Sequence, residues 1–263
     1  YAGLLQEAYD GGWIDVMENQ GKTSGAYSWG CYDSHPYVLM NYQDTVDSVF
    51  TLAHELGHSM HTYLSNQHQP YMKSDYTIFV AEVASTCNEI QLTHYLLDTL
   101  DDKGQRAYIL NYYLEQVRTT VFRQTMFAEF EKLSHASAEA GEPLTVDSMS
   151  DMYRKLNEDY FGENVDVDDR IAMEWMRIPH FYRPFYVYKY ATGFSAAAAL
   201  AGLIRDEGQG AVDRYLTFLS SGCSDYPINL LQNAGVDMTT PAPVDKALDE
   251  FSKLVDEMDG LLS

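Results

Sequence analysis

Basic residues are scarce in this chain. Its 263 residues include 17 lysines and arginines against 39 aspartates and glutamates, so the formal net charge is −22. Nucleic acids and anionic membrane surfaces carry the same sign of charge and would be repelled. We therefore expect neither as a partner, and we interpret the acidity as a solvated surface that favours basic or neutral substrates.

Cysteine and long hydrophobic runs are scarce as well. Cys31, Cys87 and Cys223 are odd in number and far apart, so we expect no structural disulfide and a reducing, cytoplasmic compartment. No signal peptide is evident, and the longest apolar candidate, residues 191–204, is too short to span a membrane. The chain begins at Tyr1, without a methionine, in sequence that resembles an ordered segment. This favours a longer protein of which the chain is a part.

Apolar residues are plentiful, at 46%, which excludes a disordered acidic chain. They recur mostly at helical spacing, which predicts a mainly α fold, and we expect a single domain over residues 1–263. The exception is a pair of strand candidates at 26–29 and 37–42, separated by turn residues, which predicts a β-hairpin or small antiparallel sheet. Helices are predicted at 1–9, 13–16, 46–65, 76–100, 105–138, 147–160, 171–178, 191–205, 210–220, from 227, and 244–262.

The most informative stretch is His54-Glu55-Leu56-Gly57-His58, which lies in the predicted helix 46–65. Two histidines four residues apart are about 40° apart around a helix, so both imidazoles can bind one ion. Glu55 would then lie beside that ion, where its carboxylate can act as a general base on a metal-bound water. This is the pattern of a zinc-dependent peptidase. The alternative is a solvated amphipathic helix that happens to carry two histidines.

The context of the motif favours the metal site. Residues 44–47 offer a helix N-cap with acids in the first turn, and an apolar stripe follows at helical spacing. Gly57 in mid-helix costs about 1 kcal/mol relative to alanine, so it predicts the close approach of another helix or strand. The histidines border the stripe, and we expect them to be at least half buried.

A third ligand is expected from Glu82. This carboxylate lies among small and apolar residues of the predicted helix 76–100, where an unpaired buried charge would be very costly. His61 is a rival third ligand, although we expect it at the edge of the site. Glu89 lies on the same face as Glu82, two turns later, and is predicted to accept a hydrogen bond from a ligand histidine. The alternative for Glu89 is a plain surface residue.

A second unusual stretch runs from His180 to Gly193. Its first eleven residues contain four tyrosines, one histidine and one arginine. Buried phenol hydroxyls need hydrogen-bond partners, which a polar cleft would supply. The segment is therefore either one wall of a cleft or an aromatic part of the core.

Together these segments resemble the M3 family of zinc oligopeptidases, and within it the oligoendopeptidase F group. The likeness rests on residues 54–61, 79–85 and 180–193, with further support from 222–227 and 234–238, and it covers nearly the whole chain. The 24-residue spacing from His58 to Glu82 is the one that this family requires. The resemblance implies one zinc ion per chain, held by His54, His58 and Glu82, and short peptides as substrates.

The resemblance also implies roles for the tyrosine-rich segment. We expect Tyr188 and His180 to stabilise the oxyanion, and Tyr186 and Tyr182 to contact the substrate. Family members are about twice this length, so the chain resembles a C-terminal catalytic half whose N-terminal partner half is absent. The rival functions are a helical zinc carboxypeptidase or dipeptidase, a non-catalytic peptide-binding relative, and a purely structural helical domain.

Overall fold

The computed structural model describes all residues, 1–263. The chain divides into two compact units, of which the first comprises residues 1–114 and 193–263 and the second residues 115–192. That the two act as a single catalytic domain stays a prediction. The helices are α1 (Ala2–Asp10), α2 (Val46–His68), α3 (Tyr71–Ser74), α4 (Ile78–Thr99), α5 (Lys103–Val117), α6 (Arg123–Glu139), α7 (Val146–Phe161), α8 (Tyr188–Glu207), α9 (Gln209–Leu219), α10 (Pro227–Ala234) and α11 (Ala242–Leu262).

Three short strands complete the fold, namely β1 (Ile14–Asp15), β2 (Tyr27–Trp29) and β3 (Tyr37–Leu39). The prediction of a mainly α protein with one small sheet is therefore confirmed. None of the helices combines the length and the apolar character that a membrane span requires. All three cysteines are free thiols.

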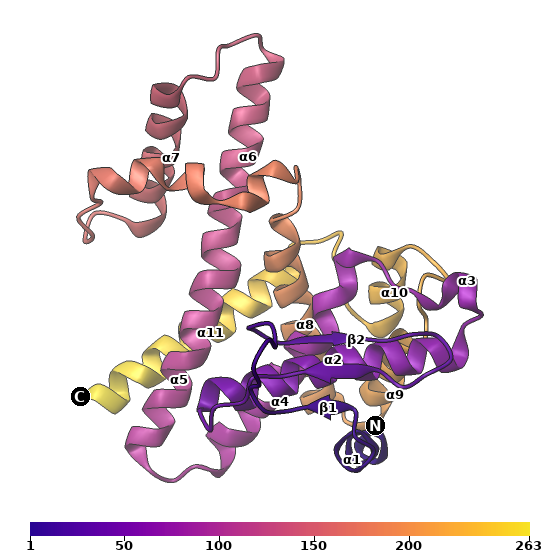
Figure 1. Cartoon of the computed structure of the whole chain (residues 1–263). Coiled ribbons are helices and arrows are strands. Elements are labelled where there is room, and N and C mark those ends of the chain that lie inside the picture. Colours follow the sequence, from indigo (N-terminus) through magenta and orange to yellow (C-terminus); the bar gives the residue numbers. More distant parts are fainter. The chain divides into compact units, whose positions relative to one another are not determined.

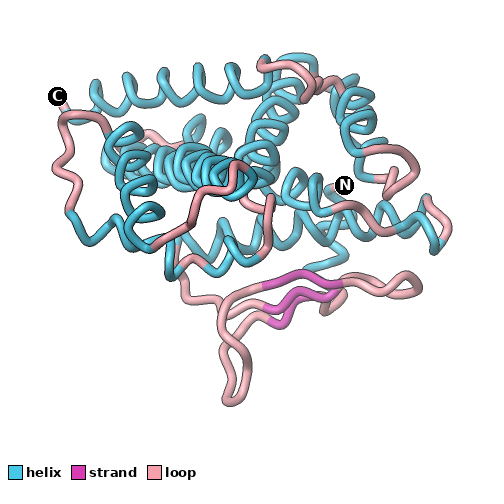
Figure 2. The backbone as a smooth tube through the Cα atoms, turned by 90° about the horizontal axis from the view of Figure 1, so that it is seen from above, coloured by secondary structure: helices cyan, strands magenta, loops and turns pink.

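The sheet has β3 at its centre, paired antiparallel with β2 and parallel with β1 (Figure 2). The β2–β3 pair is the predicted hairpin. The prediction of a second short helix at 13–16 is wrong, because this segment forms β1. The backbone of this segment is hydrogen-bonded to β3. The Val38 N–H donates to the Trp13 carbonyl and the Met40 N–H donates to the Asp15 carbonyl, both at 2.8 Å. Strand β2 is left at an edge and lies against α2 (Figure 1).

Helix α2 begins where the sequence predicts. Thr45 is its N-cap, and the Thr45 side chain accepts a hydrogen bond from the Ser48 N–H. The helix then packs against α4 over much of its length. A Cβ atom added to Gly57 would lie only 2.5 Å from Cα of Ser85, so the two backbones touch at this point. This confirms the close approach that the mid-helix glycine predicts, and it fixes the spacing between the two helices.

The first unit buries two apolar clusters that both include residues of α2. One contains Trp13 and Met60, and the other contains Phe50 and Leu110. Helix α8 is buried from Gly193 through Ala201, a stretch in which five of the nine residues are alanine.

The second unit is built from α6, α7 and two 3₁₀ segments, η2 (Asp169–Arg177) and η3 (Pro179–Tyr182). Its core includes Phe130 and Tyr153, and it buries Glu174, which pairs with Arg123 at 2.6 Å. The long helix predicted at 105–138 is interrupted by a π-helical stretch, η1 (Arg118–Phe122). The short helix predicted at 171–178 adopts the tighter 3₁₀ form.

Candidate metal centre

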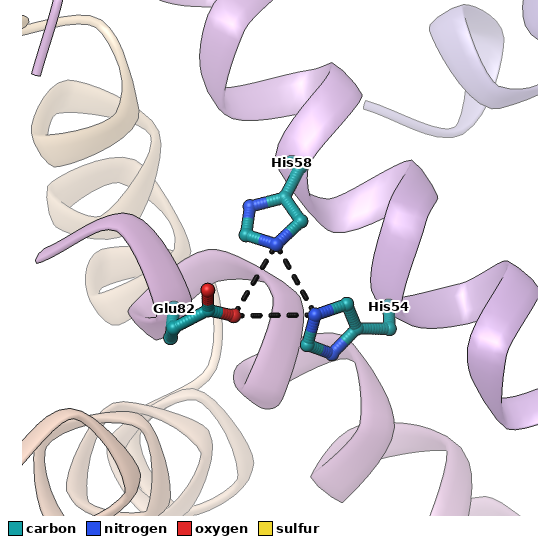
Figure 3. A group of neighbouring side chains, drawn as sticks. All are labelled: His54, His58 and Glu82. Atoms are coloured by element: carbon teal, nitrogen blue, oxygen red, sulfur yellow. Dashed lines mark hydrogen bonds and ion pairs between the residues drawn. The ribbon is translucent and has the colours of Figure 1, made fainter. Parts of the chain in front are cut away.

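Helices α2 and α4 bring three ligand side chains to one point. Figure 3 shows His54 and His58 projecting from α2 toward Glu82 on α4. The Nε2 atoms of the two histidines are 3.1 Å apart, and Oε2 of Glu82 is 3.2 Å from the first and 3.3 Å from the second. The three donor atoms form a nearly equilateral triangle.

This triangle fits a tetrahedral metal ion. Zinc binds nitrogen and oxygen at about 2.0–2.2 Å, which places neighbouring tetrahedral donors about 3.3 Å apart. The observed separations of 3.1–3.3 Å match that value. Two imidazole nitrogens and a carboxylate are also the donor types that zinc accepts at catalytic sites, where three protein ligands leave a fourth position open. The residues present therefore fit a zinc ion.

The electrostatics of the three ligands are strongly coupled. Burial lowers the pKa of His54, but the carboxylates of Glu82 and Glu89 outweigh it and raise that pKa to about 10. The pKa of Glu82 falls well below its usual range, because hydrogen bonds with the two histidines outweigh the opposing effect of burial. The cluster thus attracts positive charge, and a metal cation would replace the proton that it otherwise holds.

Glu89 lies behind the first histidine. Its Oε1 is 2.5 Å from Nδ1 of His54, while the opposite ring nitrogen faces the other ligands. Glu89 is buried. A carboxylate at this position orients the imidazole and fixes its tautomer, and it increases the basicity of the nitrogen that faces the metal.

Glu55 lies in the wall of the same cavity as the three ligands and is only 7% exposed. Burial is the largest influence on its carboxyl group and raises the pKa, although the two histidines and the backbone N–H of Ser28 counteract it. The contact with Ser28 links α2 to strand β2. A hydrogen bond of 2.8 Å between the hydroxyls of Ser28 and Ser59 ties the same strand to α2.

The cavity has a volume of about 870 Å³ and belongs entirely to the first unit. It is lined by β2 and the residues after it, by α2 and α4, and by α3 with the segment that follows it. The sequence predicted a sheet beside the metal helix but not that α3 would enclose the site. The run Tyr71-Met72, which is exposed in the structure, is the signal that could have indicated this.

His61 is not one of the converging ligands. Its ring is buried and stacks face to face on Tyr76, with a centroid distance of 3.7 Å and an interplanar angle of 3°. Burial lowers the pKa of His61 to about 3, so the ring is neutral. Tyr76 in turn lies against the cavity, and its hydroxyl is 3.0 Å from Oγ1 of Thr62.

Residues 180–192 of the tyrosine-rich segment lie in the second unit. His180 is part of η3, and its ring stacks near Tyr186 at 5.8 Å, while Nε2 is 3.4 Å from the Tyr190 hydroxyl. Tyr182 is 84% exposed, and Tyr188 opens α8 with 39% exposure. The segment is mixed in burial, because Phe181, Tyr186 and Tyr190 pack against the core of the second unit while Tyr182 and Tyr188 are exposed. The expected roles of these residues at the metal stay predictions.

The fold and the ligand triangle define a helical metallopeptidase scaffold, and comparison with known proteins gives the family. The model of peptidase family M3 matches residues 4–250, so this chain belongs to that family. Oligopeptidase PepF of Bacillus subtilis is 55% identical over 262 residues, covering 100% of this chain and 39% of its own length. Group B oligopeptidase PepB of Streptococcus agalactiae is 44% identical over 263 residues, covering 100% of this chain and 44% of its own length.

A solved structure supports the same assignment. Oligoendopeptidase-F from Enterococcus faecium superposes with a TM-score of 0.75 and 48% identity, covering 82% of this chain and 39% of that one. This chain therefore spans less than half of the length of the relatives that it matches.

Proposed function

We propose that this chain is the catalytic part of a zinc-dependent endopeptidase that hydrolyses internal bonds of short peptides. The observation that carries the proposal is the triangle of His54, His58 and Glu82 with Glu55 in the same cavity. A structural or ligand-binding site would need the three ligands alone. A buried carboxyl group with a raised pKa beside them is what proton transfer requires.

The chemistry follows from the positions of these residues. A zinc ion, when bound, supplies a Lewis acid that acidifies water and polarises a carbonyl group. Glu55 accepts a proton as a water molecule attacks the carbonyl carbon of the peptide. It then delivers that proton to the amide nitrogen as the C–N bond breaks, so that the products are a carboxyl group and an amine. Glu89 holds His54 in one orientation throughout.

Two further elements are proposed to hold the substrate. Strand β2 is an edge strand that borders the cavity, so an extended peptide can add to it as a further strand. His180 and Tyr188 are proposed to stabilise the developing oxyanion, a contribution that is typically worth about 10²–10³ in rate. Tyr182 and Tyr186 are proposed to contact the peptide.

The full protein is proposed to contain a further N-terminal half that forms the opposite wall of the substrate channel. The greater length of the relatives supports this. A cytoplasmic location is proposed as well, and the three free cysteines support it.

The proposal is tested with Glu55→Gln and an internally quenched peptide that is blocked at both ends. The variant should retain one zinc ion per chain and lose about 10²–10⁴ in turnover, because a general base contributes about that factor. Normal turnover by the variant would refute the mechanism. Cleavage of end-blocked peptides separates an endopeptidase from a carboxypeptidase or dipeptidase, since the latter two need a free terminus.

A further inference from the structure

The walls of the metal cavity are rich in carboxylates and contain no lysine or arginine. Three carboxylates line it, from Glu55, Asp75 and Glu82, and neither lysine nor arginine does. Five aromatic rings line it too, contributed by Tyr27, Trp29, Tyr32, Tyr71 and Tyr76. The environment beside the metal is therefore acidic and aromatic.

Asp75 is the carboxylate that the metal centre does not account for. When zinc is bound, its two positive charges are offset by Glu82 and Glu55, and the charge of Asp75 remains. No lysine, arginine or histidine nitrogen lies within 4.0 Å of this carboxylate in the structure, and the side chain is exposed. Its one hydrogen bond in the structure is accepted from the Tyr76 N–H at 3.1 Å.

The backbone around Asp75 is firmly held. The preceding carbonyl, of Ser74, accepts a hydrogen bond from the buried hydroxyl of Ser65 on α2. The following residue, Tyr76, is anchored by its stack on His61. Burial raises the pKa of Tyr76, and the charges of Asp75 and Glu82, which line the same cavity, act in the same direction.

Two exposed aromatic rings line the same cavity as Asp75. Trp29 is 73% exposed and Tyr71 is 70% exposed, and both line the cavity. Tyr71 is supported from behind by an edge-on contact with Tyr32 at 5.4 Å. A guanidinium or ammonium group over such a ring gains about 0.5–1 kcal/mol at an exposed site.

We propose that Asp75, with Trp29 and Tyr71, forms a subsite that binds a basic side chain of the peptide substrate. This inference rests on the proposed function and deepens it, because it names peptides that contain arginine or lysine as the preferred class. The net charge of −22 acts in the same direction, since it attracts basic peptides to the chain before they reach the cavity.

The test measures binding to Glu55→Gln, in which hydrolysis of the peptide is expected to be about 10²–10⁴-fold slower. The probes are end-blocked octapeptides of neutral residues with a single arginine placed at each position in turn. Each has a twin with citrulline, which has the shape of arginine without its charge. At one position the arginine peptide should bind about 3- to 10-fold more tightly than its twin, as expected for an exposed ion pair with a cation–π contact.

The variant Asp75→Asn, made in the same background, should remove that difference and leave the affinity for the citrulline twins unchanged. The matched control is Asp249→Asn, which removes an exposed carboxylate from α11, outside the cavity, and should preserve the preference. Zinc content and circular dichroism establish that each variant is folded.

Three results would overturn the subsite. These are equal binding of every arginine peptide and its twin, a preference that survives in Asp75→Asn, and no binding of any peptide. Tighter binding of phenylalanine peptides without a charge dependence would instead assign the rings to an apolar side chain. The proposed function fails separately, because an arginine preference in binding can coexist with an absence of hydrolysis by the unmodified chain.

Discussion

Gly57 is the position where a single methyl group should damage the metal centre without touching a ligand. In Gly57→Ala the new Cβ would lie 2.5 Å from Cα of Ser85, 2.8 Å from the carbonyl oxygen of Ala84 and 2.9 Å from the Ser85 nitrogen. All three are backbone atoms of α4 and cannot rotate away. Carbon atoms in contact are normally about 3.5–4.0 Å apart, so α2 and α4 must separate by about 1 Å.

The consequence differs for stability and for metal binding. Overpacking of this kind costs about 1–3 kcal/mol, and alanine returns about 1 kcal/mol of helix propensity, so the protein should stay folded. The histidines and Glu82, however, lie on opposite sides of the contact, and their donor atoms are only 3.1–3.3 Å apart. Metal–ligand distances tolerate about 0.2 Å, so a shift of this size should weaken zinc binding about 10- to 100-fold.

The assay is zinc affinity measured by competition with a chromophoric chelator. The matched control is Gly193→Ala, because a Cβ at this buried glycine would meet Cβ of Glu82 at an ordinary contact distance of 3.9 Å. The control should bind zinc as the unmodified chain does. Unchanged zinc affinity in Gly57→Ala would refute the argument that the helix contact sets the ligand geometry.

Three further predictions concern other buried polar groups. Glu89→Gln should raise the zinc Kd about 10- to 100-fold with an unchanged circular dichroism spectrum, because His54 loses its charged partner; an unchanged Kd would contradict this. Burial raises the pKa of Glu174, but hydrogen bonds from Tyr153 and Arg123 outweigh it, so the pKa in the folded protein is lowered. The ionised carboxylate therefore stabilises the folded state at neutral pH. This stabilisation is lost as the pH falls below the pKa in the unfolded chain, about 4.5. In urea unfolding, Glu174→Gln should therefore lower the free energy of unfolding by about 1.5–3 kcal/mol at pH 7 and by less at pH 4. An equal loss at both pH values would show that the negative charge of Glu174 is not the source of the stabilisation. Burial lowers the pKa of His61 to about 3. Between pH 6.5 and pH 3 the unfolded chain therefore binds a proton at this histidine that the folded chain does not bind. The free energy of unfolding should fall across this range by up to about 1.4 kcal/mol per pH unit. His61→Phe should keep the stack and reduce this slope, whereas the same slope in the variant would exclude His61 as its source.

Local signals in the sequence are enough to predict the elements that surround the metal site, namely α2, its contact with α4, and the hairpin before it. Thr45 and its neighbours mark the start of α2, and Gly57 marks the contact with α4, because helix caps and mid-helix glycines act over a few residues. The hairpin of β2 and β3 was equally predictable from alternation and a turn. These features fix which face of α2 carries His54 and His58.

Features that depend on distant pairing were not predictable. Strand β1 is two residues long and exists because β3 binds its backbone, so its own sequence carries no alternation and predicts a helix instead. The position of Asp75 in the cavity depends on hydrogen bonds that α2 makes with its two neighbours, Ser74 at the end of α3 and Tyr76 after it. The π-helical stretch at Arg118–Phe122 likewise leaves no pattern in the apolar spacing.

The most direct test of the metal centre is to titrate zinc into the metal-free chain and into the metal-free Glu82→Ala variant, with binding measured by calorimetry. Glu82 is the ligand whose assignment depends on the packing of α4 against α2 and not on the His-Glu-x-x-His motif alone. The account predicts one tight site per unmodified chain and a large loss of affinity in the variant. Zinc binding of equal strength in both proteins, or none in the unmodified chain, would contradict the metal centre on which the proposed peptidase activity depends.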